Sequence, residues 1–206
     1  MATILKPGVR GQRGASLAET LVVVWLVGIS AILGGPPLAH ARRTWAMATT
    51  SRRITTLMMR ARLAATSGGR ACALVFERGD RGWRCFIARD NDGDGVNRRD
   101  LDARIDTVLG ERVELTDPPA DLGILRGVAI PDPSGDGTLG GDLDDPVRAG
   151  RGDIVTFTPN ATATPCSVYI TDGRERMRVI RLFGPTARFR VLEWRAGWPV
   201  WQRAGW

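Results

Sequence analysis

The residues of this chain best suited to chemistry form a short acidic segment, Asp90-Asn91-Asp92-Gly93-Asp94-Gly95. Carboxylate oxygens at its first, third and fifth positions, with glycine at the sixth, match the first half of an EF-hand calcium loop. The second half differs, because the twelfth position holds Leu101 instead of a bidentate glutamate. The segment also fits a solvated Asp/Gly turn between strands, which is the commoner arrangement, so two explanations stay open. In a calcium loop closed by Asp100 or Asp102, the candidate ligands would be Asp90, Asp92, Asp94 and Asp100.

A single carboxylate, Glu19, lies near the start of an apolar run that extends from Leu21 to Leu33. An ionisable group inside a transmembrane helix costs about 2.5–3.5 kcal/mol on insertion scales, so such a group is a candidate functional residue. Residues 15–35 would form a helix of roughly 32 Å, close to the thickness of the hydrocarbon core of a bilayer. The sequence therefore predicts a transmembrane helix over residues 15–37 in which Glu19 has a specific role.

The C-terminal part of the chain is basic and aromatic. Arg188 and Arg190 alternate with Phe189 and Val191. Arginines beside aromatic side chains suit contact with single-stranded nucleic acid, which makes Arg188 and Arg190 a candidate DNA site. The alternation also fits a final strand with its arginines in solvent, and a partner protein could then bind exposed tryptophans. These are Trp198, Trp201 and Trp206.

Composition limits the classes of function. The chain has 206 residues and a net charge of +7. About 170 residues remain for one domain when residues 1–37, the basic N-terminal segment and the predicted membrane helix, are set aside. His40 is the only histidine and lies at the edge of the predicted membrane segment, so Ser/His/Asp and Cys/His sites are nearly excluded. No phosphate-binding loop or dinucleotide fingerprint is present. We therefore expect no enzyme, and no cofactor apart from the possible calcium ion.

The three cysteines, Cys72, Cys85 and Cys166, lack the spacing of metal ligands. Cys72 and Cys85 flank a predicted hairpin with its turn near residues 79–82. Symmetric pairing about that turn places Cys85 opposite Phe76, which disfavours a disulfide with Cys72. We expect the cysteines to be buried as small hydrophobic residues.

Hydrophobic periodicity predicts the elements that position these groups. Apolar residues at three- and four-residue spacing predict an amphipathic continuation of the helix over residues 38–69. From residue 70 the sequence changes to short β-rich runs, which predicts a β-rich domain over residues 70–206. Helix followed by strands predicts an α+β fold, with the long N-terminal helix packed on an antiparallel sheet. The expected strands span residues 71–78, 83–89, 105–115, 124–130, 153–158, 167–171, 176–183 and 187–194.

The segment Gly14-Ala15-Ser16-Leu17-Ala18-Glu19 resembles the prepilin-peptidase site of type IV pilins and pseudopilins. In that family a glycine ends the leader, and a glutamate is the fifth residue of the mature chain. Glu19 is fifth when counted from Ala15, and Pro36 lies where pilin helices often carry proline. The family usually has phenylalanine at the position of Ala15. The resemblance implies that a leader of residues 1–14 is removed, that Ala15 is N-methylated, and that the fold is pilin-like.

The resemblance also gives Glu19 a role in assembly. After cleavage the amine of Ala15 would be a cation that the Glu19 carboxylate can pair with, in the same subunit or a neighbour. In the family, pairing with a neighbour sets the register as subunits enter the filament. A buried charge without its partner costs several kcal/mol, so correct docking is favoured. A snorkelling or protonated glutamate at a membrane interface is the other explanation.

Later segments resemble the GspH/FimT branch of pseudopilins. They are Arg60-Ala61-Arg62 at a helix end, the hairpin from Trp83 to Ile87, the loop from Asp90 to Gly95, and Thr156-Phe157-Thr158-Pro159. The resemblance implies a minor pseudopilin or pilin, a structural subunit of a type II secretion pseudopilus or a type IV pilus. Its partners would be other pilins or pseudopilins through the N-terminal helix, the prepilin peptidase and the inner-membrane assembly platform.

The same resemblance implies a location and an alternative function. The protein would be a single-pass protein of the bacterial inner membrane with its C-terminal domain in the periplasm. FimT-type minor pilins bind DNA for natural transformation and have a Gly-Arg-x-Arg element near their end. Here the corresponding residues are Ala187-Arg188-Phe189-Arg190, so the glycine is missing.

Overall fold

The computed structural model describes residues 16–135, 137–150 and 152–205, and of residues 30–37 it describes the backbone alone. The contacts divide the chain into two units, Met1–Ala41 and Arg42–Trp206. Helix α1, Leu17–Gly68, accounts for nearly all described residues of the first unit and continues into the second. The candidate cleavage and methylation residues, Gly14 and Ala15, lie outside the described residues.

The predicted membrane anchor is not supported. Across the described part of the chain, no helix is both long and apolar enough to cross a membrane. The prediction of a transmembrane helix over residues 15–37, and with it of a single-pass inner-membrane protein, is therefore wrong.

Within the Arg42–Trp206 unit, one face of α1 is buried. Its buried apolar residues recur at three- and four-residue spacing, which places them on one side of a helix. They are Ala46, Met47, Ile54, Leu57, Met58, Ala61 and Ala65. The next residue after the helix is Gly69, with φ of +63°, a backbone conformation that commonly ends helices at glycine.

The first sheet has four antiparallel strands in the order β3-β2-β1-β6. The strands are β1, Cys72–Gly79, β2, Gly82–Arg89, β3, Thr107–Glu114, and β6, Ile154–Phe157. The hairpin of β1 and β2 places Phe76 opposite Cys85, which confirms the register predicted from the turn. All three cysteines are buried, and none forms a disulfide. A short helix, α2, Arg98–Asp102, connects β2 to β3.

The second sheet has six antiparallel strands in the order β10-β9-β8-β7-β4, and β5 also pairs with β7. Its long strands are β7, Cys166–Thr171, β8, Arg176–Phe183, and β9, Arg188–Arg195. The 3-10 helix η1, Gly184–Thr186, connects β8 to β9. The short strands are β4, Asp121–Leu122, β5, Val147–Arg148, and β10, Gln202–Arg203.

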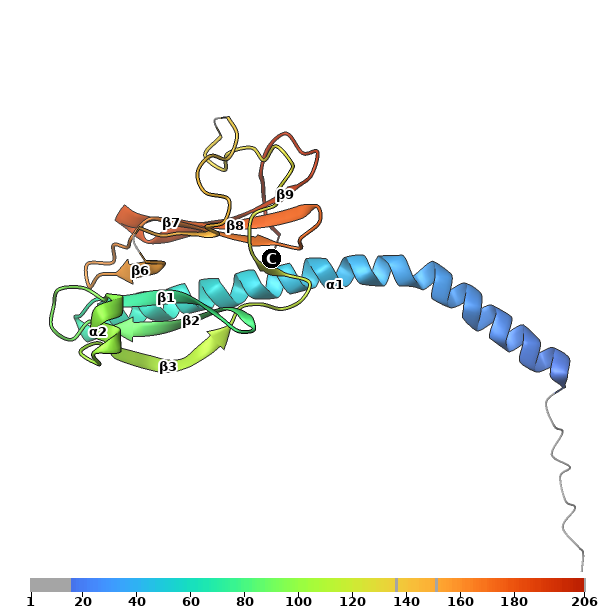
Figure 1. Ribbon diagram of the computed structural model, residues 1–206, viewed down its shortest axis with the longest axis horizontal. Helices are drawn as coiled ribbons and strands as arrows, with labels where there is room; N and C mark the ends of the chain where they lie inside the picture. The colour runs from blue at the N-terminus through green and yellow to red at the C-terminus, as the bar shows by residue number, and fades with distance from the viewer. Residues whose placement is uncertain (1–15, 136, 151, 206) are drawn as a thin grey trace, which may run out of the picture. The chain divides into compact units, whose positions relative to one another are not determined.

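The main core joins α1 to both sheets. It includes Met58 of α1, Leu74 and Phe76 of β1, and Ile170 and Ile180 of the second sheet. Figure 1 shows this part of α1 alongside both sheets. Alternate residues of the same strands form two smaller clusters, one on the other face of each sheet. The sheets are therefore covered on both faces.

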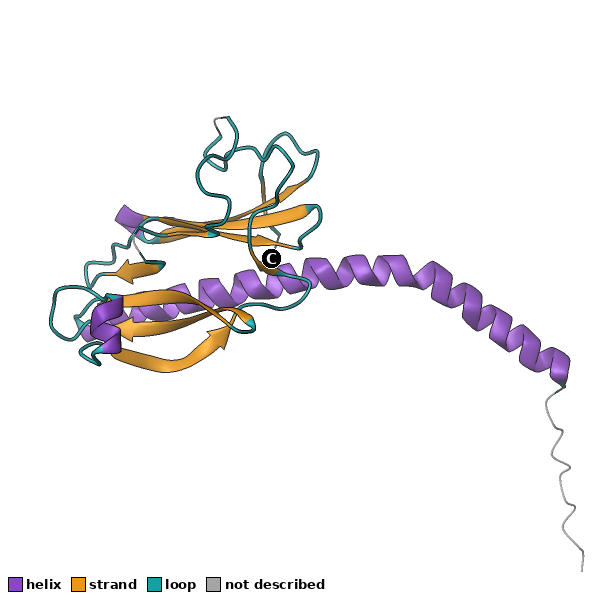
Figure 2. Cartoon of the chain, viewed as in Figure 1, coloured by secondary structure: helices purple, strands orange, loops and turns teal. Residues whose placement is uncertain are grey.

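The chain is α+β, with ten strands in two antiparallel sheets joined by long loops (Figure 2). The prediction of a pilin-like fold, in which a half-membrane helix packs on one sheet, is wrong because no helix of the described residues is long and apolar enough to span a membrane and the strands form two sheets. The sequence pattern identifies strands but not their pairing, and β4, β5 and β10 are too short to show the alternation of a strand.

Candidate functional site

The acidic loop follows β2 and is held by the end of the β2–β3 ladder. Arg89 pairs with Thr107 there, so the next residues along the two strands, Asp90 and Asp106, are brought together. Asp90 is buried, and its backbone N–H donates to the Ala71 carbonyl at 3.0 Å. Strand pairing therefore fixes the base of the loop.

The loop curls around the Asp90 side chain. The two carboxylate oxygens of Asp90 accept hydrogen bonds from the backbone N–H of Gly93 at 2.7 Å and of Gly95 at 3.1 Å. Both glycines have positive φ, +95° and +97°, a region that glycine enters without the strain of a Cβ atom. Gly95, the glycine predicted at the sixth position of a calcium loop, and Gly93 are thus the residues that allow the loop to close.

The structure brings Asp90, Asp92 and Asp94 together. One carboxylate oxygen of each lies within 4.8 Å of the others, with Asp92 and Asp94 exposed. Desolvation, and then the charges of Asp92 and Asp100, raise the pKa of the Asp94 carboxyl. The carboxylates therefore repel one another, and a cation among them would relieve this repulsion.

Asp100, the fourth predicted ligand, is buried beside the loop, whereas Asp102 is exposed. Asn97 positions it: the Asn97 Oδ1 accepts from the backbone N–H of Asp100 at 3.0 Å, which caps α2, and the Asn97 Nδ2 donates to the Asp100 carboxylate. Of the two residues that the sequence offered to close the loop, the structure turns Asp100 inward.

Asp106 is a fifth carboxylate that sequence reasoning missed. It is 4% exposed, and its Oδ1 accepts from the backbone N–H of Asn91 at 3.2 Å. Its Oδ2 is buried and has no hydrogen-bond partner among the described residues. Burial raises the pKa of the Asp106 carboxyl. Hydrogen bonds from the backbone N–H groups of Asn91 and Asn97 lower this pKa, and the charges of Asp90 and Asp92 raise it. The available signal was an aspartate inside an apolar strand pattern.

Glu19 lies in the first turn of α1. Its backbone N–H donates to the Ser16 Oγ at 3.3 Å, and the spacing Ser-x-x-Glu is that of a capping box. A carboxylate in the first turn also interacts favourably with the helix dipole. Glu19 therefore has a local role in starting the helix, which the sequence analysis did not consider.

The apolar side chains around Glu19 are exposed. Between Leu17 and Val27 the large apolar side chains of α1 have exposed fractions of 53–80%, and they are Leu17, Leu21, Val22, Val23, Val24, Trp25, Leu26 and Val27. A helix that is apolar on all sides is normally buried in a larger structure. This segment of the Met1–Ala41 unit is thus a candidate interaction surface.

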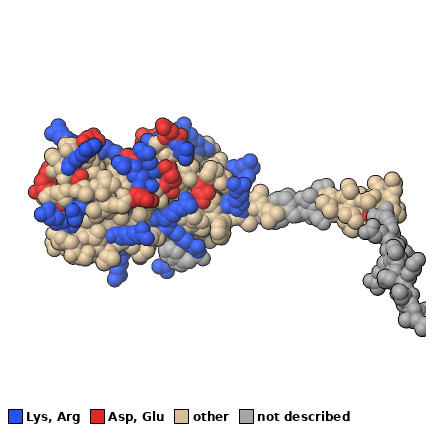
Figure 3. Space-filling view, turned by 90° about the horizontal axis from the view of Figure 1, so that it is seen from below, with Lys and Arg blue, Asp and Glu red and all other residues tan. Residues whose placement is uncertain are grey.

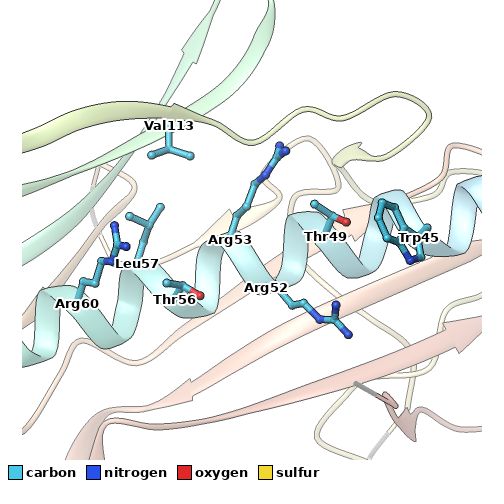
Figure 4. Close-up of a pocket in the computed structure, with 8 residues that line it drawn as sticks. All are labelled: Trp45, Thr49, Arg52, Arg53, Thr56, Leu57, Arg60 and Val113. Atoms are coloured by element: carbon cyan, nitrogen blue, oxygen red, sulfur yellow. The ribbon is translucent and has the colours of Figure 1, made fainter.

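A groove lies on the outward side of α1 in the Arg42–Trp206 unit, next to β3 (Figure 4). Its volume is about 360 Å³, and it is lined by Trp45, Thr49, Arg52, Arg53, Thr56, Leu57, Arg60 and Val113. In Figure 4, Leu57 points toward Val113, while Arg52 points away from it. Trp45 is 75% exposed, and Met59 and Leu63 are exposed on the same side of the helix. The groove therefore lies beside the buried face, with the buried Leu57 at its edge, while Trp45, Met59 and Leu63 are exposed away from the core.

Arg188 and Arg190 are both exposed on β9. Arg190 pairs with Arg181 and Arg188 with Phe183 across the β8–β9 ladder. The guanidinium groups of Arg181 and Arg190 lie 5.9 and 5.5 Å from the centre of the exposed Phe183 ring, within range of cation–π attraction. On the face seen in Figure 3, basic side chains are spread among acidic ones. The candidate DNA residues thus form a small local cluster.

The C-terminal tryptophans are packed within the unit. Trp198 and Trp201 are partly buried against the cluster around Trp194, with the Trp194 and Trp201 ring centres 6.2 Å apart. The Trp201 Nε1 donates to the Pro131 carbonyl at 2.6 Å. The expectation that Trp198 and Trp201 are exposed is wrong, and Trp206 lies outside the described residues.

Comparisons of the chain with protein-family models, with curated proteins and with solved structures gave no match. Membership of the GspH/FimT branch therefore stays a prediction from the residues that resemble it. The function that follows is inferred from these residues and from the surfaces described above.

Proposed function

We propose that this chain is a minor pseudopilin or pilin, a structural subunit of a type II secretion pseudopilus or a type IV pilus. The observation that carries the proposal is the junction Gly14-Ala15 with Glu19 four residues further on, directly before a helix segment with exposed apolar side chains. Contiguous apolar surface of this kind marks an interaction site. Helices of neighbouring subunits would cover it.

Glu19 would select the register of those helices. Removal of residues 1–14 by a prepilin peptidase would leave a cationic amine at Ala15. Among packed apolar helices, a carboxylate that lacks its partner costs several kcal/mol, while one that meets the amine of a neighbour is compensated. A subunit that docks one turn out of place would therefore be disfavoured.

The Arg42–Trp206 unit adds a second surface to this proposal. Trp45, Met59 and Leu63 are exposed on the side of α1 away from the core. Trp45 lines the groove, and Met59 and Leu63 are exposed on the same side of the helix. Exposed aromatic side chains in a groove are typical anchors of protein–protein contacts. We propose that this groove receives another subunit.

The test is the mature N-terminus. The chain would be produced together with a prepilin peptidase and its N-terminal peptide analysed by mass spectrometry. We expect a chain that begins at N-methylated Ala15, and a Gly14→Lys variant that keeps its leader. An uncleaved wild-type chain, or cleavage at another junction, would contradict the proposal.

A second candidate function is DNA binding, favoured by the exposed Phe183 ring beside the guanidinium groups of Arg181 and Arg190. Bases can stack on such a ring while guanidinium groups contact phosphates. A mobility-shift assay with single-stranded DNA should then show binding that Arg188→Ala/Arg190→Ala weakens. The matched control is Arg78→Ala/Arg81→Ala, which removes two exposed charges from the β1–β2 hairpin. Equal loss in both variants would indicate only nonspecific charge attraction.

A further inference from the structure

We infer that the groove on α1 receives the acidic turn of residues 142–145 from a second copy of this chain. The groove presents arginines beside apolar side chains, and the turn presents aspartates beside an exposed leucine. The inference rests on the proposed function, in which this groove receives another subunit, and it names the segment that enters.

Three arginines give the groove a positive charge that no carboxylate balances. Arg52, Arg53 and Arg60 line the groove and are exposed. None of the eight lining residues is acidic, and none of the ion pairs among the described residues includes these arginines. The Arg53 Nη1 donates to the Glu114 backbone carbonyl at 3.4 Å, which leaves its charge without a counter-charge. A segment that enters the groove should therefore be acidic.

The groove also contains apolar surface. Leu57 points toward Val113 of β3, and Trp45 lies at one end of the groove (Figure 4). Arg53 and Arg60 are four residues before and three residues after Leu57, so they lie on the same side of the helix. This arrangement favours a peptide with an apolar side chain among its acidic ones over a uniformly charged polymer such as DNA.

The turn before β5 has the complementary pattern. Asp142, Asp144 and Asp145 surround Leu143, which is 38% exposed. The Asp142 Oδ1 accepts from the backbone N–H of Asp144 at 2.8 Å, and the Arg148 Nη2 donates to the Asp142 carbonyl at 2.8 Å. These bonds hold the turn in one shape, and a preformed segment loses less entropy when it binds.

The carboxylates of the turn are available for new ion pairs. Asp144 pairs with Arg126, but their side chains are 70% and 68% exposed, and an exposed pair contributes little to stability. Asp142 and Asp145 belong to none of the ion pairs among the described residues. Docking into the groove would therefore break at most one weak ion pair.

The turn and the groove are different surfaces, so the contact between copies would be heterologous. Such a contact leaves a free groove on one copy and a free turn on the other, and it repeats in an open assembly unless it closes into a ring. A contact of this size is weak by itself. Packing of the N-terminal helices of the same two subunits would raise its effective concentration.

The test is chemical cross-linking of two full-chain variants, with different tags, mixed in mild detergent. One carries Thr56→Cys in the groove, and the other carries Gly140→Cys beside the turn, where a Cβ atom would meet no atom beyond its chain neighbours within 4 Å. A short bismaleimide reagent at pH 7 should join them into a heterodimer, while the native cysteines stay unmodified because they are buried. The matched control is Thr66→Cys, an exposed position roughly 15 Å further along α1 that should give little heterodimer.

Charge reversal tests the chemistry of the contact. Arg53→Glu/Arg60→Glu in the groove copy should lower the yield of heterodimer at least about ten-fold, because like charges would then face each other. The control Arg78→Glu/Arg81→Glu changes the net charge equally in the β1–β2 hairpin and should leave the yield unchanged. Sodium chloride at about 1 M should lower the yield, because salt screens exposed charges.

A reciprocal exchange identifies the segment that enters. Asp142→Arg/Asp144→Arg in the turn copy should restore the heterodimer with the reversed groove. If circular dichroism shows that this variant does not fold, Leu143→Ser takes its place, since it changes one exposed side chain. Leu143→Ser should lower the yield about three-fold with the unchanged groove, through the loss of apolar contact.

Four results would overturn the inference. They are equal yields from Thr56→Cys and Thr66→Cys, equal losses from the groove and hairpin reversals, a yield that neither the groove reversal nor Leu143→Ser lowers, and cross-links only between two groove copies, which would mean that two grooves face each other. Leader removal after Gly14 tests the proposed function separately. Cleaved chains without the heterodimer would overturn this inference alone, and uncleaved chains that form it would overturn the proposed function alone.

Discussion

Arg178 and Glu193 form a buried ion pair whose disruption should strongly destabilise the protein. The residues face each other on β8 and β9, and the Arg178 Nε and Nη2 donate to the Glu193 Oε2 at 3.0 and 2.7 Å. Arg178 is buried, and with Ala48 and Ser51 it lines a small space beside α1. The perturbation is Arg178→Met, which keeps an unbranched apolar stem and removes the guanidinium group with its charge.

The structure sets the magnitude. Removal of one partner of a buried pair typically costs about 3–5 kcal/mol, because the other charge is left uncompensated. Glu193 is partly exposed, and the Arg176 Nη1 already lies 3.9 Å from its Oε1, so water and Arg176 would recover part of this loss. We therefore expect a loss of about 3 kcal/mol in the free energy of unfolding, equivalent to a fall in melting temperature of roughly 6–12 °C for a unit of this size.

The assay is urea unfolding followed by circular dichroism and tryptophan fluorescence. The variant Arg178→Met/Glu193→Leu, with no charge left in the site, should recover to within about 1 kcal/mol of the wild type. The exposed pair of Arg195 and Glu175, with 3.0 Å between Nη2 and Oε1, gives the control, since Arg195→Met should cost less than about 1 kcal/mol. Wild-type stability of Arg178→Met, or a double variant no more stable than the single one, would refute this reasoning.

Three other results are expected. Glu19→Gln preserves the capping-box geometry but not the charge, so it should keep helicity and lose filament incorporation in a pilus or pseudopilus assembly assay; normal incorporation would leave Glu19 only its role in helix initiation. Burial raises the pKa of the Asp106 carboxyl above its usual 3.8, so the folded state binds more protons. The free energy of unfolding should therefore fall as the pH rises from about 4 through the raised pKa, and this fall should be smaller in Asp106→Asn. Burial raises the pKa of the Cys85 and Cys166 thiols to about 12, so a thiol reagent at pH 8 should modify neither until the protein is unfolded.

Local signals predicted local structure well. The turn at residues 79–82 predicted the pairing of Phe76 with Cys85, because the register of a hairpin follows from its turn. Apolar content misled at residues 124–130, which were predicted as a strand. Ile124 and Ile130 are buried against Trp194, but the backbone there is not a strand. A buried loop and a paired strand can both be rich in apolar residues, so composition could not distinguish them.

The acidic site shows what spacing cannot supply. The motif identified Asp90, Asp92 and Asp94, since their relative positions depend on a few consecutive residues. Asp106 reaches the site only because β2 and β3 pair with Arg89 opposite Thr107, with a shift in register between Cys85 and Ile87. A contact set by the pairing of separate strands, and by a bulge within it, cannot be read from sequence periodicity.

The outer position of β3 in the first sheet bears on how copies of this chain can associate. An edge strand with free main-chain groups can template pairing with another molecule. β3 is poorly suited to this, because Gly110 has φ of +80° in its middle and charged side chains follow at Glu111, Arg112 and Glu114. Protection of this edge should keep the chain from forming cross-β aggregates at high protein concentration. Copies would then associate through side chains of α1, in contacts that detergent can reverse.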